Sequence, residues 1–240
     1  YLATRGHHPD IGGIHPGSMT PEAKKLIDEG VIFDNFKIRM NDLTNHERLQ
    51  KKLNSGKYPA RNPELNIQDI TAQVASNKIG EIQLRKIIDY YGLDIVLGQM
   101  YAIQENAKEA CLGLLKNIKP SNFSMTLDNF YLKLEIKKHS ECEKINFDFT
   151  GSSRESSDNF NAPFPITKAV IIYVLRCLIN EDIPLNSGIL EPVEISTDSN
   201  SIINPSKNAA VSAGNVELSQ ALANCIFGAL SIKASCQSTM

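Results

Sequence analysis

The chain has 240 residues, a formal net charge of -2 at pH 7, 42% hydrophobic residues and 22% charged residues. These values are ordinary for a globular protein, and they give no general attraction to nucleic acid or to an acidic membrane surface. The most apolar run, residues 169–179, contains Arg176 and falls short of the roughly 20 apolar residues that a membrane span needs. We therefore expect neither a nucleic-acid nor a membrane role.

The five cysteines lie far apart and form no Cys-x-x-Cys pair. They are Cys111, Cys142, Cys177, Cys225 and Cys236. Their odd number and wide spacing predict reduced thiols in a cytoplasmic protein, rather than a disulfide framework or a zinc site.

The first quarter of the chain predicts short elements joined by loops. Residues 1–19 are rich in Gly, His and Pro, which indicates a strand end followed by a structured loop. Residues 20–30 begin with Thr-Pro and end with Gly, which predicts a short helix. Residues 31–40 alternate apolar and polar side chains and predict a strand. Residues 45–53 predict a second short helix.

Two long helices come next. Apolar residues at helical spacing run from Ile67 to Tyr91, where Gly92 ends the helix, and a second run extends from residue 95 to residue 118. The tight turn between them predicts an antiparallel helical hairpin, at about residues 66–118, that packs as a unit.

The remainder, about residues 122–240, predicts strands and buried helices. The expected elements are strands at 130–136, 145–149 and 190–196, a hairpin connection at 139–144, and helices at 166–178 and 216–230. Helical and strand segments mix without a βαβ rhythm, so the predicted fold class is α+β rather than doubly wound α/β. The chain opens directly on a dense motif and ends without a polar tail, which indicates one part of a larger enzyme.

The segment from Gly6 to Asp10, Gly-His-His-Pro-Asp, is the densest in potential chemistry. Neutral imidazole and carboxylate groups are good ligands for divalent transition metals. On an extended backbone, His8 and Asp10 would share one face while His7 would point to the other. The alternative is a polar loop whose histidines cap backbone groups. The glycine-rich residues 12–19 that follow could cradle an anion, but they lack the Lys and spacing of a P-loop, so a tight turn is favoured.

Four short polar turns follow apolar elements later in the chain. They are residues 148–152, 159–163, 184–188 and 214–217. Asn and Asp favour turns because their side chains bond the local backbone, so each turn can be explained without function. Together they could also converge on a cleft that binds a polar ring. The substrate-binding candidates are Asn159, Asn161, Asn186 and Gly214. The carboxylate of Glu217 opens a helix, where the helix dipole favours an anion.

Several motifs resemble the hydantoinase B family. Thr4 to Met19 is similar to that family's (S/T)RGHHxDIGGxxPGSM segment, and Arg61 to Asn77 is similar to its RNPxxNxxDLxAQxAAN helix start. Further matches follow in the family's order, at residues 147–151, 159–163, 182–188, 213–217 and 234–240. Cys236 and Ser238 depart from the last of these motifs. The resemblance covers essentially the whole chain.

This resemblance implies a two-part enzyme of the kind found in 5-oxoprolinases, N-methylhydantoinases and the acetone and acetophenone carboxylases. A hydantoinase A-type subunit or domain binds ATP and activates the substrate, and the B-type part, resembled here, completes the reaction. We therefore expect an A-type partner, a cyclic-amide substrate, no ATP site in this chain, and an oligomeric enzyme.

The resemblance also implies site residues. In carboxylase relatives the B-type part holds a divalent metal through an upstream His-x-x-Asp motif and the first histidine of the His-His pair. That corresponds to His7, with His8 and Asp10 as neighbours, and the metal would be manganese or zinc. The similarity of residues 213–217 to the family's Gly-Asn-Val-Glu motif makes Asn215 and Glu217 candidate catalytic residues, together with Asp10.

The sequence thus predicts the B-type part of an ATP-dependent hydrolase that opens a five-membered cyclic amide, such as 5-oxoproline or a hydantoin. Two alternatives stay open: a carboxylase α-type subunit that acts on a ketone, and a non-catalytic scaffold that keeps the fold without the site.

Overall fold

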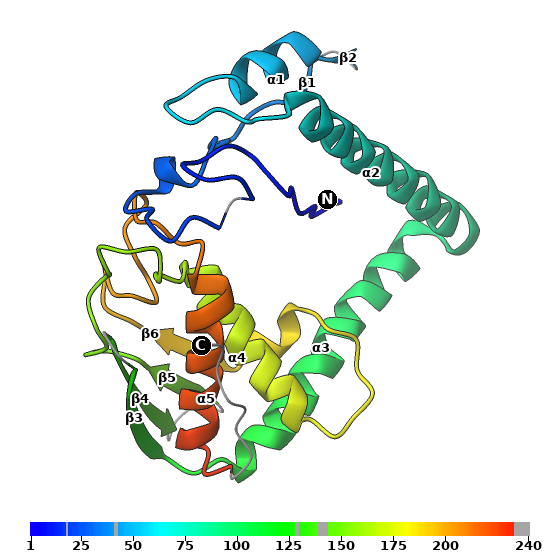
Figure 1. Cartoon of the computed structure of the whole chain (residues 1–240). Helices are drawn as coiled ribbons and strands as arrows, with labels where there is room; N and C mark the ends of the chain where they lie inside the picture. The colour runs from blue at the N-terminus through cyan, green and yellow to red at the C-terminus, as the bar shows by residue number, and fades with distance from the viewer. Residues whose placement is uncertain (18, 41–42, 128–129, 139–143, 233–240) are drawn as a thin grey trace. The chain divides into compact units, whose positions relative to one another are not determined.

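A computed structural model describes residues 1–17, 19–40, 43–127, 130–138 and 144–232. The chain divides into two compact units (Figure 1). Unit 1 contains Tyr1–Val96, Ser157–Asn159 and Asn208–Ser212, and unit 2 contains the remaining described residues. The fold class is α+β, as the sequence predicts.

Unit 2 is built on a four-stranded mixed sheet. Its strands are β3 (Ser121–Leu127), β4 (Phe130–Lys138), β5 (Ile145–Asp148) and β6 (Val193–Ser196), in the order β3-β4-β5-β6. The β5–β6 pair is parallel and the other pairs are antiparallel. In β4 the side chains of Leu132, Leu134 and Ile136 are buried and alternate with more exposed neighbours, because successive side chains of a strand point to opposite faces.

The helices of unit 2 share one apolar core with the sheet. They are α3 (Leu93–Asn117), α4 (Phe164–Leu178) and α5 (Ser219–Ala229), with a 3-10 turn η2 (Ser187–Leu190) and a π turn η3 (Gly214–Leu218). Helix α5 lies on β3 and β4, and α4 packs against α5 (Figure 1). The apolar faces of both layers form one continuous core. Cys111 and Cys225 lie in it, and burial raises the pKa of both thiols to about 12, as expected for inert core cysteines.

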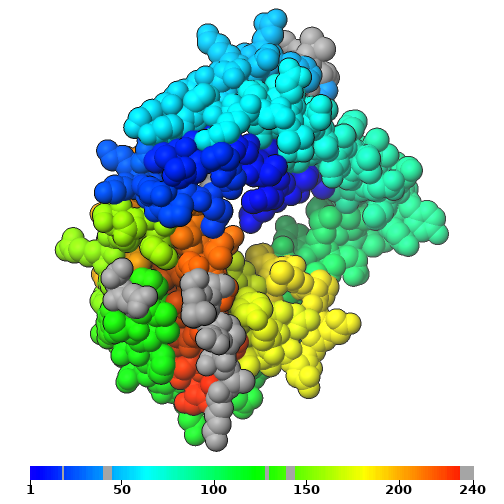
Figure 2. Space-filling view, in the orientation of Figure 1, coloured from blue at the N-terminus to red at the C-terminus, as the bar shows by residue number. Residues whose placement is uncertain are grey.

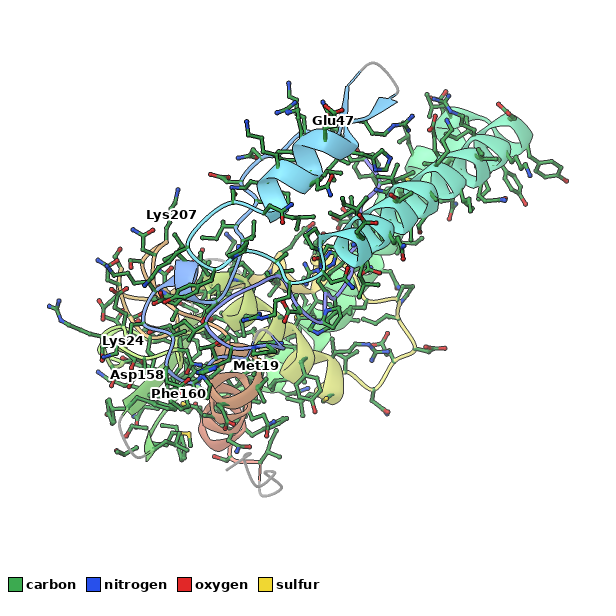
Figure 3. The ribbon with its side chains drawn as sticks, turned by 45° about the horizontal axis from the view of Figure 1, so that its top comes forward. Met19, Lys24, Glu47, Asp158, Phe160 and Lys207 are labelled. Carbon is green, nitrogen blue, oxygen red and sulfur yellow. The ribbon has the colours of Figure 1, made fainter. Side chains whose placement is uncertain are left out.

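Unit 1 contains little regular structure besides two helices. These are α1 (His46–Leu53) and α2 (Pro63–Tyr91), and the shorter elements are η1 (Leu26–Asp28), β1 (Arg39–Met40) and β2 (Leu43–Thr44). The N-cap of α1 is Asn45, whose side chain accepts a hydrogen bond from Arg48 N. Glu47 lies in the first turn of α1 (Figure 3), where its carboxylate complements the positive end of the helix dipole.

Two expected elements near the N-terminus differ from the structure. The helix expected at residues 20–30 is replaced by turns and the single turn η1, because the backbone of this segment bonds elsewhere: Leu26 N donates to Asn208 O at 2.9 Å, and Lys25 forms an isolated bridge with Ala209. The strand expected at 31–40 is wrong except for β1, since residues 31–38 have no strand partner within the described chain.

The two long helices are confirmed as α2 and α3, and their packing as one hairpin stays a prediction. Helix α2 belongs to unit 1, whereas α3 belongs to unit 2 from Leu97 on. Both helices leave large apolar side chains exposed near their junction. These are Ile79, Ile82, Ile87, Tyr90, Tyr91, Leu93, Ile95, Leu97, Met100, Tyr101 and Ile103. Apolar periodicity predicted the helices correctly, but it could not indicate which surface covers their apolar faces.

The strand end expected within residues 1–19 is also wrong, since the described residues of that segment form no strand. The other expected elements agree with the structure within a few residues, and β3 is an element that the sequence did not indicate. The connection expected at 139–144, the motif at 234–240 and the thiols of Cys142 and Cys236 lie largely or wholly outside the described residues. None of the described helices is both long enough and apolar enough to cross a membrane.

Candidate functional site

The glycine-rich loop folds around the carboxylate of Asp10. Oδ1 of Asp10 accepts a hydrogen bond from Gly12 N at 2.8 Å, and Oδ2 accepts one from Gly17 N at 3.1 Å. Gly12 has a φ of 98° and lies so close to the carbonyl groups of Tyr58 and Pro59 that a Cβ atom would collide with them. This loop therefore depends on glycine at position 12 and on the carboxylate at position 10.

Arg61 fixes the loop from the N-terminal side of α2. Its Nη1 lies 3.0 Å from Oδ2 of Asp10 and 3.1 Å from the carbonyl oxygen of Gly12, and its Nη2 donates to Gly13 O at 2.7 Å. Partial burial raises the pKa of Asp10, but the amides of Gly12 and Gly17 and the Arg61 guanidinium outweigh burial and lower this pKa below its ordinary value. Both oxygens of Asp10 thus hold the loop together, and its catalytic role stays a prediction.

Alternate residues of the N-terminal segment lie against one face of α2. In Figure 2 this segment is the dark blue surface next to the cyan part of unit 1. The four pairs are Leu2 with Gly80, Thr4 with Asn77, Gly6 with Gln73, and His8 with Asp69. Two residues of extended chain span roughly 6.6 Å, which is close to the roughly 5.4 Å of one helical turn. Every second residue of the segment therefore contacts a successive turn of α2, in the direction of the N-terminus of the helix. The helix thereby sets which side chains of the segment face it.

His8 faces α2, whereas His7 does not. Nδ1 of His8 lies 3.3 Å from Oδ2 of Asp69 and 3.4 Å from Nδ2 of Asn66. Asn66 Nδ2 donates one of its two N–H groups to Asp10 O at 2.9 Å. Because the Asp69 carboxylate can only accept, we assign the proton of His8 to Nδ1. In this tautomer Nε2 keeps its lone pair. The imidazole of His7 is exposed and makes no hydrogen bond to any described residue.

Asn159 and Asn161 use their amides to hold the chain itself. Asn159, in unit 1, donates from Nδ2 to Thr20 O at 2.8 Å and to Ser212 Oγ at 3.0 Å. Asn161, in unit 2, accepts from Ser156 N at 2.7 Å and donates to Ser156 O at 3.0 Å. Their predicted contact with substrate stays a prediction, beside these structural roles.

Asn186 and Gly214 also have local structural roles in unit 2. Asn186 is the N-cap of η2: its Oδ1 accepts from Gly188 N at 2.8 Å, and its Nδ2 donates to Ile103 O at 3.2 Å. Gly214 is buried against the carbonyl group of Asn161, where no Cβ atom would fit. Close backbone packing explains this glycine without a ligand.

The turn that contains Asn215 and Glu217 is a π turn, η3, which leads directly into α5. The N–H of Glu217 donates to Ala213 O at 2.8 Å, and its side chain is half-buried. The side chain of Asn215 is exposed, while its carbonyl oxygen accepts from Ser219 Oγ. Single π turns at helices are frequent at functional sites. The catalytic role of Asn215 and Glu217 stays a prediction.

Asp148, in the first of the four polar turns, uses both carboxylate oxygens in contacts with neighbouring residues. Its Oδ1 accepts from Thr150 N at 3.0 Å, and its Oδ2 lies 2.9 Å from Lys137 Nζ. Partial burial raises the pKa of Asp148, but Thr150 and Lys137 together outweigh burial and lower it to about 2. This carboxylate therefore links the two inner strands of the sheet, β4 and β5.

Comparison with known proteins identifies the family. The sequence model of the hydantoinase B/oxoprolinase family matches residues 1–240. The chain belongs to this family.

Relatives within the hydantoinase B/oxoprolinase family are much longer. The 5-oxoprolinase of Dictyostelium discoideum is 39% identical over 250 residues, and the match covers 100% of this chain and 19% of that protein. The chain thus spans about a fifth of the length of the first curated relatives that it matches.

Two solved structures share the fold. The ATP-dependent caprolactamase from Pseudomonas jessenii matches with a TM-score of 0.76 at 19% identity, over 93% of this chain and 40% of that one. The nucleotide-free acetone carboxylase matches with a TM-score of 0.78 at 15% identity, over 94% of this chain and 32% of that one. At these identities the likeness shows the fold alone.

Few donor atoms are available for the divalent metal that the sequence predicts. Among the described residues, no three His, Cys, Asp or Glu side chains gather as a metal site. Asp10 is neutralised by Arg61, which leaves His7 and Nε2 of His8 as the unengaged donors of the loop. These residues fit a metal only as one side of a larger ligand set.

The sequence contained a signal that we had not used. Asn66, Asp69, Gln73 and Asn77 are spaced by three or four residues and therefore lie along one face of α2. The apolar residues of this helix predict its bounds, whereas its polar face binds the N-terminal segment. Arg61 precedes the same helix, and no local pattern indicated that it would bind Asp10.

Proposed function

We propose that the chain forms the part of an ATP-dependent cyclic-amide hydrolase, of the 5-oxoprolinase or N-methylhydantoinase type, that completes ring opening of an activated intermediate. The observation that carries this proposal is the His-His loop, fixed by Arg61 and by the polar face of α2, in a chain of the hydantoinase B/oxoprolinase family. The 39% identity to a 5-oxoprolinase favours this function over the carboxylase alternative, for which there is a likeness of fold alone.

In this proposal the loop presents two imidazoles with different tasks. Asp69 holds His8 so that Nε2 can accept a proton or bind a cation. His7 is exposed and would bind a manganese or zinc ion together with ligands from outside the described residues. A bound metal of this kind polarises a carbonyl group or activates water. The positioning of the His8 ring comes from α2 and needs no ligand.

The proposal assigns ATP chemistry to a hydantoinase A-type subunit or domain. The chain has no Gly-x-x-x-x-Gly-Lys-Ser/Thr motif, and its glycine-rich loop is folded onto the carboxylate of Asp10, which disfavours an anion at the same place. We accordingly propose a cytoplasmic, oligomeric enzyme in which this chain alone does not hydrolyse ATP.

The deciding experiment removes His7 from the complete enzyme assembled with its A-type part. His7→Ala should lower bound divalent metal and 5-oxoproline ring opening together, by more than the roughly 10- to 100-fold that loss of an outer-shell partner costs. His15→Ala is the matched control, because His15 belongs to the same loop but pairs with Glu22 at 3.0 Å. Full metal content in His7→Ala would reject His7 as a metal ligand. Absence of metal from the unchanged enzyme, with normal turnover in His7→Ala, would favour a scaffold.

A further inference from the structure

The carboxylate of Glu29 is buried in unit 1 and holds a distant segment of the chain. The residue is 8% exposed, and its Oε1 accepts hydrogen bonds from Val211 N at 2.7 Å and Ser212 N at 2.8 Å. These donors lie 182 and 183 positions further along the chain. Among the described residues, the two amides have no other acceptor. A single side chain therefore holds the end of the segment 208–212.

Glu29 itself rests on the glycine-rich loop. The neighbouring carbonyl oxygen of Asp28 accepts a hydrogen bond from Ile14 N at 2.9 Å. A Cβ atom on Gly13 would lie only 2.9 Å from the carbonyl oxygen of Glu29, so the backbones of these two residues are in close contact. The loop contacts the backbone at Glu29, and the side chain of Glu29 contacts the segment 208–212, all within unit 1.

The segment held by this carboxylate leads directly into the π turn η3. Only Ala213, the N-cap of η3, separates Ser212 from the turn. The carbonyl oxygen of Ala213 accepts from Val216 N at 3.1 Å and from Glu217 N at 2.8 Å. These two bonds close the π turn on the residue that follows the held segment. A displacement of Ser212 would therefore move the start of the turn that contains Asn215.

We propose that Glu29 is a positioning residue for η3, because it holds the chain immediately before the N-cap of this turn. In this role it acts through Val211 and Ser212 and touches no substrate atom. A second contact supports the same segment, since Asn159 Nδ2 donates to Ser212 Oγ at 3.0 Å. The importance of η3 for catalysis rests on the proposed function, whereas the contacts of Glu29 rest on the distances above.

Two substitutions separate the hydrogen bonds of Glu29 from its charge. Burial raises the pKa of Glu29, and the N–H groups of Ser212 and Val211 only partly offset this effect. A carboxamide would accept the same two hydrogen bonds without a buried charge. Glu29→Gln therefore keeps the contacts that the proposal needs, whereas Glu29→Ala removes them.

The first test follows hydrogen exchange in the 240-residue chain. Glu29→Ala should accelerate exchange about tenfold at Val211 and Ser212, which lose a charged acceptor. Exchange at Val216 and Glu217 should accelerate in the same variant, while the amides of helix α4 keep their rates. Glu29→Gln should restore slow exchange at all four positions. Acceleration confined to Val211 and Ser212 would overturn the proposal.

The second test measures ring opening in the complete enzyme with its A-type part. Glu29→Ala should lower kcat at least about tenfold with little change in KM, because a displaced turn loses contacts made in the transition state. Glu29→Gln should restore kcat. Glu155→Ala is the matched control, since Glu155 Oε2 accepts from Ser206 N at 2.6 Å and belongs neither to the glycine-rich loop nor to η3. This control should keep its kcat.

An unchanged kcat in Glu29→Ala, or an equal fall in Glu155→Ala, would overturn the positioning role. If Glu29→Ala does not fold, Glu29→Asp makes the same comparison, because it withdraws the carboxylate by one methylene. If the unchanged enzyme opens no cyclic amide, the proposed function fails, and hydrogen exchange at Val216 and Glu217 still decides whether Glu29 positions the turn.

Discussion

The two units of the chain are stabilised in different ways. Unit 2 buries large side chains in one continuous core that joins a sheet to its helices, including Phe147, Leu134 and Ile171 at 0% exposure. Unit 1 buries few apolar side chains, several of them alanines, and leaves much of α2 exposed, with Ile79 at 60% and Tyr90 at 80%. The glycine-rich loop of unit 1 and the histidines before it are fixed mainly by ion pairs and hydrogen bonds to Arg61 and to the polar face of α2.

The difference concerns what each unit offers to a ligand. A dense apolar core tolerates little change, but it has no groups that can bind a substrate or a metal. A loop fixed by polar contacts on a helix presents imidazoles and amides at a surface, at the cost of a smaller stabilising core. We therefore expect mutations in the apolar core of unit 2 to act on folding, and mutations around the glycine-rich loop of unit 1 to act first on the geometry of that loop.

The largest stability effect should come from the core of unit 2. Phe147→Ala should lower the free energy of unfolding by about 3–5 kcal/mol, because it removes a fully buried ring and leaves a cavity. The matched truncation in unit 1, Ile79→Ala on α2, should change it by no more than about 0.5 kcal/mol, since that side chain is exposed. Urea unfolding followed by circular dichroism measures both.

A large loss of stability in Ile79→Ala would show that α2 is covered in solution. The contrast between the two units would then reflect an interface rather than two modes of stabilisation.

An intermediate effect is expected at Arg61. Arg61→Ala should lower stability by about 2 kcal/mol, because Asp10 and three backbone carbonyl groups lose a charged donor. Hydrogen exchange at Gly12 and Gly13 should accelerate. Arg61→Lys should recover less than half of the loss, since an ammonium group cannot reproduce the planar fork of the guanidinium. Full rescue by Lys would mean that charge alone holds the loop.

The sequence predicted most of unit 2 and less of unit 1, for a physical reason. In unit 2 the alternation of Leu132, Leu134 and Ile136 records the burial of one strand face, which is a local pattern. In unit 1, residues 20–40 take their shape from distant partners, such as the backbone of Ala209 and Val211. Local propensity contains no information about such partners, and the expected helix and strand were accordingly wrong.

The site shows the same limit. Adjacent histidines can be read directly, and alternation along an extended segment correctly separates His7 from His8. The role of Asp10 could not be read, because the partner that occupies it, Arg61, lies 51 positions away in the chain. Asn66 was equally hidden, because the carbonyl oxygen of Asp10, to which its amide donates, lies 56 positions away in the chain.

The smallest stability effect is expected at Asn215, in the π turn that leads into α5. A lost helix cap costs about 1 kcal/mol. Asn215 is not such a cap, because its side chain is exposed and Ala213, the N-cap of η3, makes no side-chain cap bond. We therefore expect Asn215→Ala to change the free energy of unfolding by no more than about 0.5 kcal/mol.

Activity should respond far more strongly than stability if this turn faces the active cleft of the complete enzyme. A positioned polar group in a closed site contributes roughly a hundredfold in rate, so kcat of Asn215→Ala should fall on that scale while the melting temperature stays constant. Ser219→Ala is the matched control, since it removes the hydroxyl that donates to Asn215 O and leaves the carboxamide in place. A variant that keeps full kcat would assign the turn to structure alone. A fall in kcat for Asn215→Ala but not for Ser219→Ala would assign the effect to the carboxamide itself.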